Sequence, residues 1–299
     1  MPALAGNDKG YKWTVLLIAC MGSVMGPLDS TIVSVTLPTI SQDLVMDYTT
    51  SVWVPTSYLA VTAALLLSMG RLSDMRGRKP IYVSGFAVFA LGSLLCSLAQ
   101  DGGQLIAFRA LQGVGAAALM ATSPALITDA FPPQERGKAL GINAMSVYIG
   151  LSLGPPLGAF LTEELGWRAI FWVNIPIAAA VIVLAQWKIA RPSASMNGAR
   201  FDLAGASSFA VALVAFLIAL GLLFVAASLL LAFVVTEKRL GRRALFQLDL
   251  VTRNRLFAAG NLSALLNYTS YFGVSFILSF YLQRVLDLDL YATGMILLS

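Results

Sequence analysis

The sequence contains no histidine among its 299 residues. Histidine is the usual general base, the commonest metal ligand and the side chain that ordinarily titrates near neutral pH. The two cysteines, Cys20 and Cys96, lie inside apolar runs without metal-ligand spacing, so we interpret them as small packing residues. We therefore expect no metal or other cofactor, and any proton chemistry must use carboxylates.

Charge is also scarce. Charged residues make up 12% of the chain and hydrophobic residues 58%, whereas a soluble domain carries about 25% charged residues. The apolar runs approach the roughly 20 residues that an α-helix needs to cross a bilayer. This composition predicts an all-α integral membrane protein whose main surroundings are the lipid bilayer.

The formal net charge of +5 could suggest a nucleic-acid partner. The basic residues, however, lie in short loops between apolar runs, where they orient membrane proteins, so we expect no nucleic acid. The first apolar run follows Lys9 and Lys12 and continues through Pro27 and Asp29 to Leu37 without a small-residue cleavage site. It is predicted to be a retained first span and not a removed signal.

Long apolar stretches predict a series of membrane spans. They lie near residues 12–37, 51–69, 81–99, 104–128, 138–162 and 169–187. Beyond these come an uncharged stretch from Leu203 to Val235, a span near 257–282 and the opening of another at Ala292.

Lysine and arginine are concentrated in alternate loops. Cytoplasmic loops carry the excess of these residues, so the N-terminus is predicted to be cytoplasmic in a multi-pass protein of the plasma (inner) membrane. The opposite loops contain only Arg168 and Arg284. The basic set is Lys9, Lys12, Arg71, Arg76, Arg78, Lys79, Arg136, Lys138, Lys188, Arg191, Arg200, Lys238, Arg239, Arg242, Arg243, Arg253 and Arg255.

This alternation requires the stretch from Leu203 to Val235 to cross the membrane twice, because both of its flanks are basic. As one helix it would be about 50 Å long, which is too long for one straight span and short for two. We predict a tight hairpin that turns near Gly221. A single steeply tilted helix is the alternative, and it would place the arginine-rich loop at 238–255 on the opposite side.

Arg109 is the basic residue that lies inside a predicted span. An intramembrane charge costs at least about 2.5 to 3.5 kcal/mol on insertion scales, so it normally faces a water-filled cavity or a partner. Asp29 in the first span lies at a similar depth, roughly 12 Å from the outer end against roughly 8 Å for Arg109. The alternatives are that Arg109 extends to the outer surface and that Asp29 caps a helix restarted after Pro27.

Desolvation favours the neutral form of a carboxyl group, whereas a nearby arginine favours its charged form. A site that holds both can gain and lose a proton as its water and ligands change. The predicted pairing of Asp29 with Arg109 therefore suggests a proton-coupled transporter.

The segment after the second span reads Gly70-Arg71-Leu72-Ser73-Asp74-Met75-Arg76-Gly77-Arg78-Lys79. An orientation signal explains the lysine and arginine residues of this segment. It does not explain Gly70, Gly77 or Asp74. Glycines permit a tight turn between helices, and an acid among four bases can hold a specific salt-bridged state. We interpret the segment as a candidate two-state latch.

The fifth span carries Gly150, Gly154 and Gly158 at a four-residue spacing, with Pro155 and Pro156 among them. A glycine face lets another helix approach closely, while prolines kink a helix and free backbone carbonyls. Generic close packing and a bend or seal between two moving halves both remain open.

At these residues the sequence resembles the major facilitator superfamily, and most closely its fourteen-helix drug:proton antiporter branch. Residues 70–79 are similar to the signature G-x-L-a-D-r-x-G-r-k, with Met75 in place of one base. Leu105, Arg109, Gln112, Gly113, Gly115, Ala116 and Ala117 match l-x-x-x-R-x-x-q-G-x-g-a-a. Gly150, Gly154, Pro155 and Gly158 match the antiporter signature, with Ala159 at its last glycine. The segments from Leu28 to Pro38 and from Gly166 to Pro176 are similar to the same branch, with Ser34 and Thr36 as departures.

This resemblance, which covers residues 28–176 in the right order, implies a fold and an activity. It implies alternating access between two six-helix halves, with Asp29 and Arg109 lining the cavity and taking part in proton coupling. Asp74 and Arg78 would form a gating cluster, with Asp129 as a further candidate member. Gly150, Gly154, Pro155 and Gly158 would be the antiporter hinge. The substrate would be a small drug-like or cationic compound, exported in exchange for protons.

The resemblance also implies a domain organisation. It consists of a cytoplasmic N-terminus at 1–11, a six-helix N-terminal bundle at 12–189, a cytoplasmic linker at 190–202, a two-helix hairpin at 203–236, a basic cytoplasmic loop at 237–256 and, at 257–299, the start of a second, incomplete bundle. An inactive or accessory membrane subunit or fragment, without transport by itself, is therefore the alternative function. A membrane enzyme is not expected, because no nucleophile lies beside a base.

Overall fold

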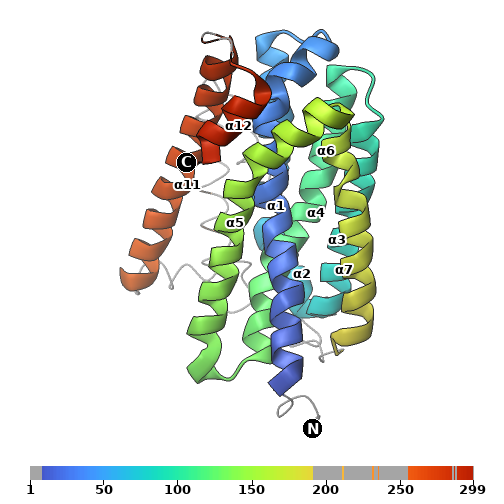
Figure 1. Cartoon of the computed structure of the whole chain (residues 1–299). Coiled ribbons are helices and arrows are strands. Elements are labelled where there is room, and N and C mark those ends of the chain that lie inside the picture. Colours follow the sequence, from blue (N-terminus) through green and yellow to red (C-terminus); the bar gives the residue numbers. More distant parts are fainter. Residues whose placement is uncertain are drawn as a thin grey trace.

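The computed structural model describes residues 9–190, 255–284, 286 and 288–298, together with the single residues 211, 231 and 235. These residues form helices joined by short turns (Figure 1). The expected hairpin at 203–236, with most of the linker and basic loop on either side of it, lies outside them apart from those single positions. That residues 203–235 cross the membrane twice therefore stays a prediction, with a single tilted helix as the alternative.

Six helical segments are long and apolar enough to cross a membrane, counted over the described residues. The prediction of an all-α membrane fold is confirmed. They are built from α1 (Lys9–Asp43), α2 (Tyr48–Arg76), α3 (Arg78–Ser97), α4 (Gly102–Ala130), α5 (Pro133–Leu165), and α6 (Ala169–Trp172) with α7 (Asn174–Lys188).

Most of these helices extend beyond the apolar runs that predicted them. The first begins at Lys9 and ends at Asp43, whereas the apolar run gave 12–37. It is continuous through Pro27, so Asp29 lies inside a helix and does not cap a restarted one. Long polar side chains at helix ends reach the membrane surface, and for this reason a span predicted from apolar residues is shorter than its helix.

The turn between α2 and α3 is much shorter than the loop expected at 70–79. The second helix continues through Gly70 to Arg76, and Gly77 alone separates it from α3. Gly77 has φ 96° and ψ 145°, a conformation that a side chain disfavours. Gly77 therefore makes the turn, and Gly70 is helical.

The sixth span is divided at Val173 between α6 and α7. The backbone stays helical there, with φ −61° and ψ −27°. Pro176 has no N–H to donate to the carbonyl four residues earlier, which belongs to Trp172, and this accounts for the interruption. Asn174 is the first residue of α7 and lies at this interruption.

Two apolar clusters fill the bundle, one toward each end of α1. The cluster near the N-terminal half of α1 contains Met25, Tyr82 and Phe86, and the other contains Leu37 and Phe171. Asp29 lies on α1 four residues after Met25 of the first cluster and directly after Leu28 of the second. The apolar core therefore encloses a polar level near the middle of the helices.

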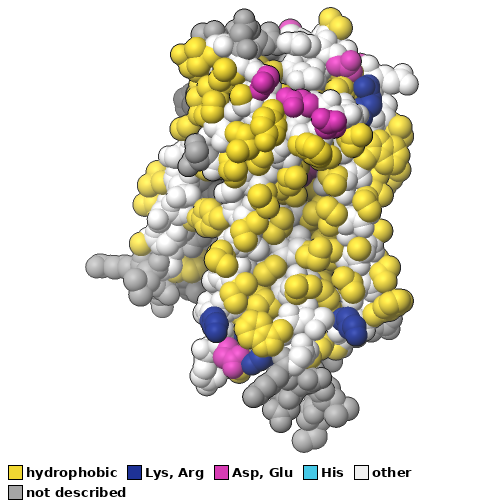
Figure 2. Space-filling view, in the orientation of Figure 1, with side chains coloured by type: hydrophobic (Ala, Val, Ile, Leu, Met, Phe, Trp, Pro, Cys, Tyr) yellow, Lys and Arg dark blue, Asp and Glu magenta, His cyan; other side chains and the backbone are white. Residues whose placement is uncertain are grey.

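The surface has an apolar belt between two charged ends. Figure 2 shows acidic side chains gathered at one end, basic ones mainly at the other, and yellow apolar side chains between them. Exposed apolar residues such as Leu17, Met145 and Phe160 belong to this belt. Such a surface suits hydrocarbon as solvent, with every helix satisfying its own backbone hydrogen bonds.

Two further helices pack on the outside of this bundle, against α1 and α5 (Figure 1). They are α11 (Arg255–Arg284) and α12 (Leu290–Leu298). Gln283 Nε2 donates to the carbonyl of Val35 at 2.9 Å, which joins α11 to α1. The hydroxyl of Tyr271 donates to the carbonyl of Leu151 at 3.0 Å, which joins α11 to α5.

Candidate functional site

Asp29 and Arg109 form an ion pair inside the bundle. Arg109 Nη1 donates to Asp29 Oδ2, and the two residues are 0% and 2% exposed. The Arg109 guanidinium also lies over the ring of Tyr58, with Cζ 4.1 Å from the ring centroid. The alternative in which Arg109 extends to the surface is therefore wrong, and α1 and α4 are neighbours as the pairing required.

Two amides complete the surroundings of the carboxylate. Gln112 Nε2 on α4 and Asn174 Nδ2 on α7 both donate to Asp29 Oδ1, each at 2.9 Å. The same two amides donate to Ser93 Oγ on α3, at 2.8 and 3.2 Å. Asp29 thus accepts hydrogen bonds from three buried side chains on α4 and α7, and Ser93 brings α3 into the same hydrogen-bond network. We call Ser93, Arg109, Gln112 and Asn174, with Asp29, the Asp29 cluster.

Helix spacing and small residues bring these groups together. Arg109 and Gln112 are three residues apart and so share a face of α4. A Cβ at Gly92 would lie 2.7 Å from Gln112 Cα, and one at Gly113 would lie 2.7 Å from the carbonyl of Tyr58. Glycine at both positions lets α3 and α2 approach α4 closely enough for the side chains to meet.

The Asp29 cluster is not fully satisfied by the protein. Arg109 Nε, Arg109 Nη2 and Asn174 Oδ1 are buried and have no hydrogen-bond partner among the described residues. Most buried polar atoms in proteins are paired, and exceptions often mark functional sites. The arrangement therefore holds unused donors on the arginine and an unused acceptor on the asparagine.

The resemblance led us to expect that Asp29 and Arg109 line the cavity between two halves, and this stays a prediction. Within the part of the chain that the structure describes, both side chains are buried. Helices α1 to α4 and α7 enclose them, because the glycines bring these helices close together. One cavity of about 420 Å³ lies instead between the α1–α2 turn and α11, and another of about 690 Å³ lies between α11 and α12. None of the Asp29 cluster residues lines either of these cavities.

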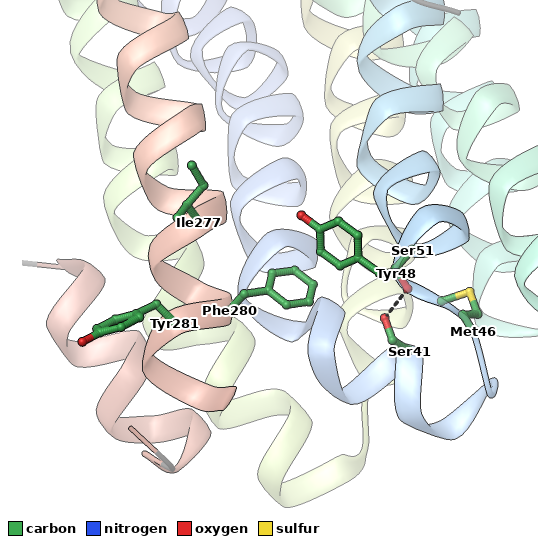
Figure 3. Close-up of a pocket in the computed structure, with 7 residues that line it drawn as sticks. All are labelled: Ser41, Met46, Tyr48, Ser51, Ile277, Phe280 and Tyr281. Carbon is green, nitrogen blue, oxygen red and sulfur yellow. Dashed lines mark hydrogen bonds between the residues drawn. The ribbon is translucent and has the colours of Figure 1, made fainter. Parts of the chain in front are cut away.

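The cavity beside the α1–α2 turn is aromatic. Figure 3 shows Tyr48 from α2 and Phe280 from α11 facing each other across it, with ring centroids 5.8 Å apart. The hydroxyls of Ser41 and Ser51 are already bonded to each other at 2.8 Å. Its lining residues are uncharged: Ser41, Met46, Tyr48, Ser51, Ile277, Phe280 and Tyr281.

The residues expected to form a gating cluster meet at the end of the bundle where α1 begins. Arg78 lies 2.5 Å from Asp129 Oδ1 on α4 and 3.6 Å from Asp74 Oδ1 on α2. It also donates to the carbonyl of Ala125. Arg78 therefore links the ends of α2, α3 and α4, and the three side chains are partly exposed.

The glycines of α5 face α1 of the same bundle. A Cβ at Gly150 would lie 2.9 Å from the carbonyl of Val24, and one at Gly158 would lie 3.1 Å from that of Ile32. The neighbouring Pro155 faces a different helix, since Gly294 of α12 packs against its carbonyl. One side of α5 thus seals against α1 and another contacts α12.

Both the sequence and the helical bundle are similar to known proteins. The sequence profile of the Major Facilitator Superfamily matches residues 19–299. The chain belongs to the Major Facilitator Superfamily. It is therefore part of a multi-pass membrane transporter family and not an enzyme.

Relatives of this chain include a riboflavin transporter and a multidrug resistance protein. The chain is 34% identical over 292 residues to Riboflavin transporter RibZ of Clostridioides difficile (strain 630), covering 96% of this chain and 64% of that protein. It is 31% identical over 314 residues to Multidrug resistance protein 3 of Bacillus subtilis (strain 168), covering 99% of this chain and 60% of that protein. The chain thus spans about three fifths of the length of these relatives, and the resemblance to a drug-exporting branch agrees with the second name.

Solved structures show the same fold. A bacterial homologue of the human lysosomal transporter Spinster, in an inward-facing and unoccupied conformation, superposes with a TM-score of 0.61 at 18% identity. The match covers 97% of this chain and 59% of that one. The six-helix bundle with its two further helices therefore follows the superfamily architecture.

Sequence reasoning found only part of the Asp29 cluster. Gln112 and Asn174 matched superfamily motifs, but their bonds to Asp29 were not foreseen. Ser93 carried no signal, since serines are frequent in these helices. A search for amides and hydroxyls at the depth of Asp29 could have identified Gln112, which lies three residues from Arg109. It could not have shown that Asn174 of α7 bonds to Asp29 and to Ser93 of α3.

Proposed function

We propose that the protein containing this chain exports small lipophilic or cationic compounds in exchange for protons, by alternating access in the plasma membrane. The N-terminus lies in the cytoplasm in this proposal, because the basic loops share its side. The observation that carries the proposal is the buried Asp29–Arg109 pair. A carboxylate enclosed at the middle of a membrane bundle is costly to maintain, and such residues commonly serve proton relays or substrate pathways.

The chemistry follows from the surroundings of Asp29. With Arg109 beside it, the ionised carboxylate forms a neutral pair, and its three donors are matched to the charged form. Proton binding would remove the negative charge and leave Arg109 without its counter-ion. The bundle therefore offers two states of different charge, which a proton gradient can bias in opposite directions on the two sides of a membrane.

The latch and the hinge belong to the same proposal. Arg78, with Asp74 and Asp129, would hold one state at the end where α1 begins, and exchange of these partners would accompany the transition. Gly150, Gly154, Pro155 and Gly158 would form the hinge, where the glycines contact α1 and the carbonyl of Pro155 contacts α12. The similarity to Multidrug resistance protein 3 supports a drug-like substrate for this protein. The similarity to Riboflavin transporter RibZ is compatible with a planar heteroaromatic substrate.

The test is transport by the product of the whole reading frame that contains these residues, reconstituted in proteoliposomes. An inside-acid pH gradient should drive uptake of a fluorescent lipophilic cation such as ethidium. Asp29→Asn should abolish the gradient-driven part of uptake, because its amide cannot take up the proton. Asp101→Asn is the matched control: it also removes one carboxylate, but asparagine caps a helix about as well as aspartate.

Two outcomes would overturn the proposal. One is folded protein without gradient-driven uptake, which would favour an accessory membrane subunit. The other is an Asp29→Asn variant that transports as well as the Asp101→Asn control.

A further inference from the structure

In the side-chain amide of Asn174, the NH₂ group donates hydrogen bonds, whereas the oxygen accepts none from the residues that the structure describes. The residue is 1% exposed. Its Nδ2 donates to Asp29 Oδ1 at 2.9 Å and to Ser93 Oγ at 3.2 Å, whereas its Oδ1 has no hydrogen-bond partner among the residues that the structure describes. An amide that is a donor on one side and an unused acceptor on the other can serve two partners in turn.

The charge of Asp29 decides which end of this amide faces it. An ionised carboxylate only accepts hydrogen bonds, so the NH₂ group must point at it. Once Asp29 holds a proton on Oδ1, its O–H is a donor, and the amide N–H would oppose it. Rotation about the Cβ–Cγ bond of Asn174 would bring Oδ1 to accept from this O–H. Ser93 could follow, because a hydroxyl can either donate or accept.

Gln112 cannot make the same exchange. Its Oε1 accepts from Arg109 Nη1 at 2.6 Å and lies 3.9 Å from the sulfur of Cys96. Turning this amide would place its NH₂ group against the guanidinium, which has only donors. The two amides on Asp29 Oδ1 therefore differ: Gln112 is held by the arginine, and Asn174 is free to turn.

We propose that Asn174 is a positioning residue whose amide turns when Asp29 takes up a proton, and that it thereby reports the charge of Asp29 to the start of α7. This inference rests on the proposed function. In the step, a hydronium ion transfers one proton to Asp29 Oδ1: one O–H bond of the hydronium ion breaks, one O–H bond forms on the carboxyl group, water is released, and the charge of the Asp29–Arg109 pair rises from zero to +1. Asn174 lies where the helix is interrupted before Pro176, so its side chain acts on a weakened part of the sixth span.

Other groups around Asp29 are accounted for. Among the residues that the structure describes, the titratable groups that face it are Arg109 from α4, Tyr58 from α2 and Cys96 from α3. Helix α7 contributes the uncharged Asn174, and α5 meets this part of α1 with glycines. Tyr58 is the acceptor ring under Arg109 and donates its hydroxyl to the carbonyl of Gly26 at 3.3 Å. Among these groups Asn174 alone is uncharged, bonded to Asp29 and unpaired at its other end.

The test is infrared difference spectroscopy of the purified protein during a pH titration, which needs no transport. The band of a protonated carboxyl group that disappears in Asp29→Asn is assigned to Asp29. In Asn174→Leu this band should move to a higher frequency, because the O–H of Asp29 loses its acceptor while Arg109 still donates to Oδ2.

Asn143→Leu is the matched control. Asn143 is also a buried asparagine of the bundle, but it accepts from Ser23 Oγ at 2.8 Å and makes no bond to Asp29. It should leave the frequency of the Asp29 band unchanged. Should Asn174→Leu fail to fold, isotope-labelled asparagine in the unmutated protein gives a second measurement: an asparagine amide band should change with the Asp29 titration and stay constant in Asp29→Asn.

The outcomes separate this inference from the proposed function. An Asp29 band whose frequency is unaffected by Asn174→Leu, an asparagine amide band that does not change during the titration, or the absence of any Asp29-dependent band would each overturn the inference. Coupled bands in a protein without gradient-driven uptake would overturn the proposed function and leave the role of Asn174 standing.

Discussion

Gly154→Ala should strongly destabilise the bundle, while the same substitution at Gly141 on the same helix should stabilise it. An added Cβ at Gly154 would lie 1.8 Å from Thr31 Oγ1, 2.7 Å from Thr31 Cβ and 3.2 Å from the backbone nitrogen of Ile32. Rotation of the threonine could move its hydroxyl but not its Cβ, so the backbones of α1 and α5 would have to separate. At Gly141 an added Cβ would meet nothing within 4 Å.

The expected magnitudes follow from these contacts. Overpacking of a well-packed core costs about 1–3 kcal/mol, and a 1.8 Å overlap belongs at or above the upper end. Replacing glycine by alanine within a helix gains roughly 0.5–1 kcal/mol when space allows. The unfolding free energies of the two variants should therefore differ by about 3 kcal/mol.

The assay is titration from a mild detergent into SDS, with helical circular dichroism as the measure of unfolding. Gly141→Ala controls for helix propensity and for handling in detergent. Thr31→Ala in the Gly154→Ala background should recover part of the loss, with a coupling energy of about 1 kcal/mol. Equal unfolding free energies for Gly154→Ala and Gly141→Ala would refute the close contact between α1 and α5.

Three further substitutions test other parts of the bundle by the same unfolding measurement. Arg109→Met should lower the free energy of unfolding by about 3–5 kcal/mol, because it leaves the buried carboxylate of Asp29 without a counter-ion. Adding Asp29→Asn should restore much of this stability, and no restoration would contradict the pairing. Gly77→Ala should cost about 1–2 kcal/mol because φ is 96° there, and an unchanged stability would contradict the turn geometry. Arg78→Gln should cost at most about 1 kcal/mol, since its partners are partly exposed, with the difference shrinking at high salt; a large, salt-independent loss would show that the cluster is more buried than described.

The membrane class and the fold of residues 9–190 were accessible from the sequence. Scarce charge and long apolar runs leave few alternatives to membrane helices, because a backbone in hydrocarbon must satisfy its own hydrogen bonds. The family resemblance, drawn from ordered motifs such as those around Arg109 and Gly154, is confirmed by the superfamily match. The sidedness of the N-terminus stays a prediction, since a bundle without a bilayer has two ends but no inside.

Pairing of Asp29 with Arg109 was foreseen because a charge in a membrane span needs a partner, and few candidates exist at that depth. Their complete enclosure was not foreseen. It depends on Gly92 and Gly113, which bring α3 and α2 against α4, and a sequence does not show which helices a glycine face will meet. The extent of α2 through Gly70 was likewise missed, because glycine is common both in turns and in membrane helices.

Asn174 shows most clearly the difference between local structure, which the sequence specifies, and contacts that depend on helix packing. Its place before Pro176 is visible in the sequence and places it at a helix interruption. That its amide reaches Asp29 from α7, beside Ser93 of α3 and Gln112 of α4, results from the convergence of four helices. Periodicity specifies the faces of single helices, but hydrogen bonds between residues 145 positions apart arise only when those helices pack together.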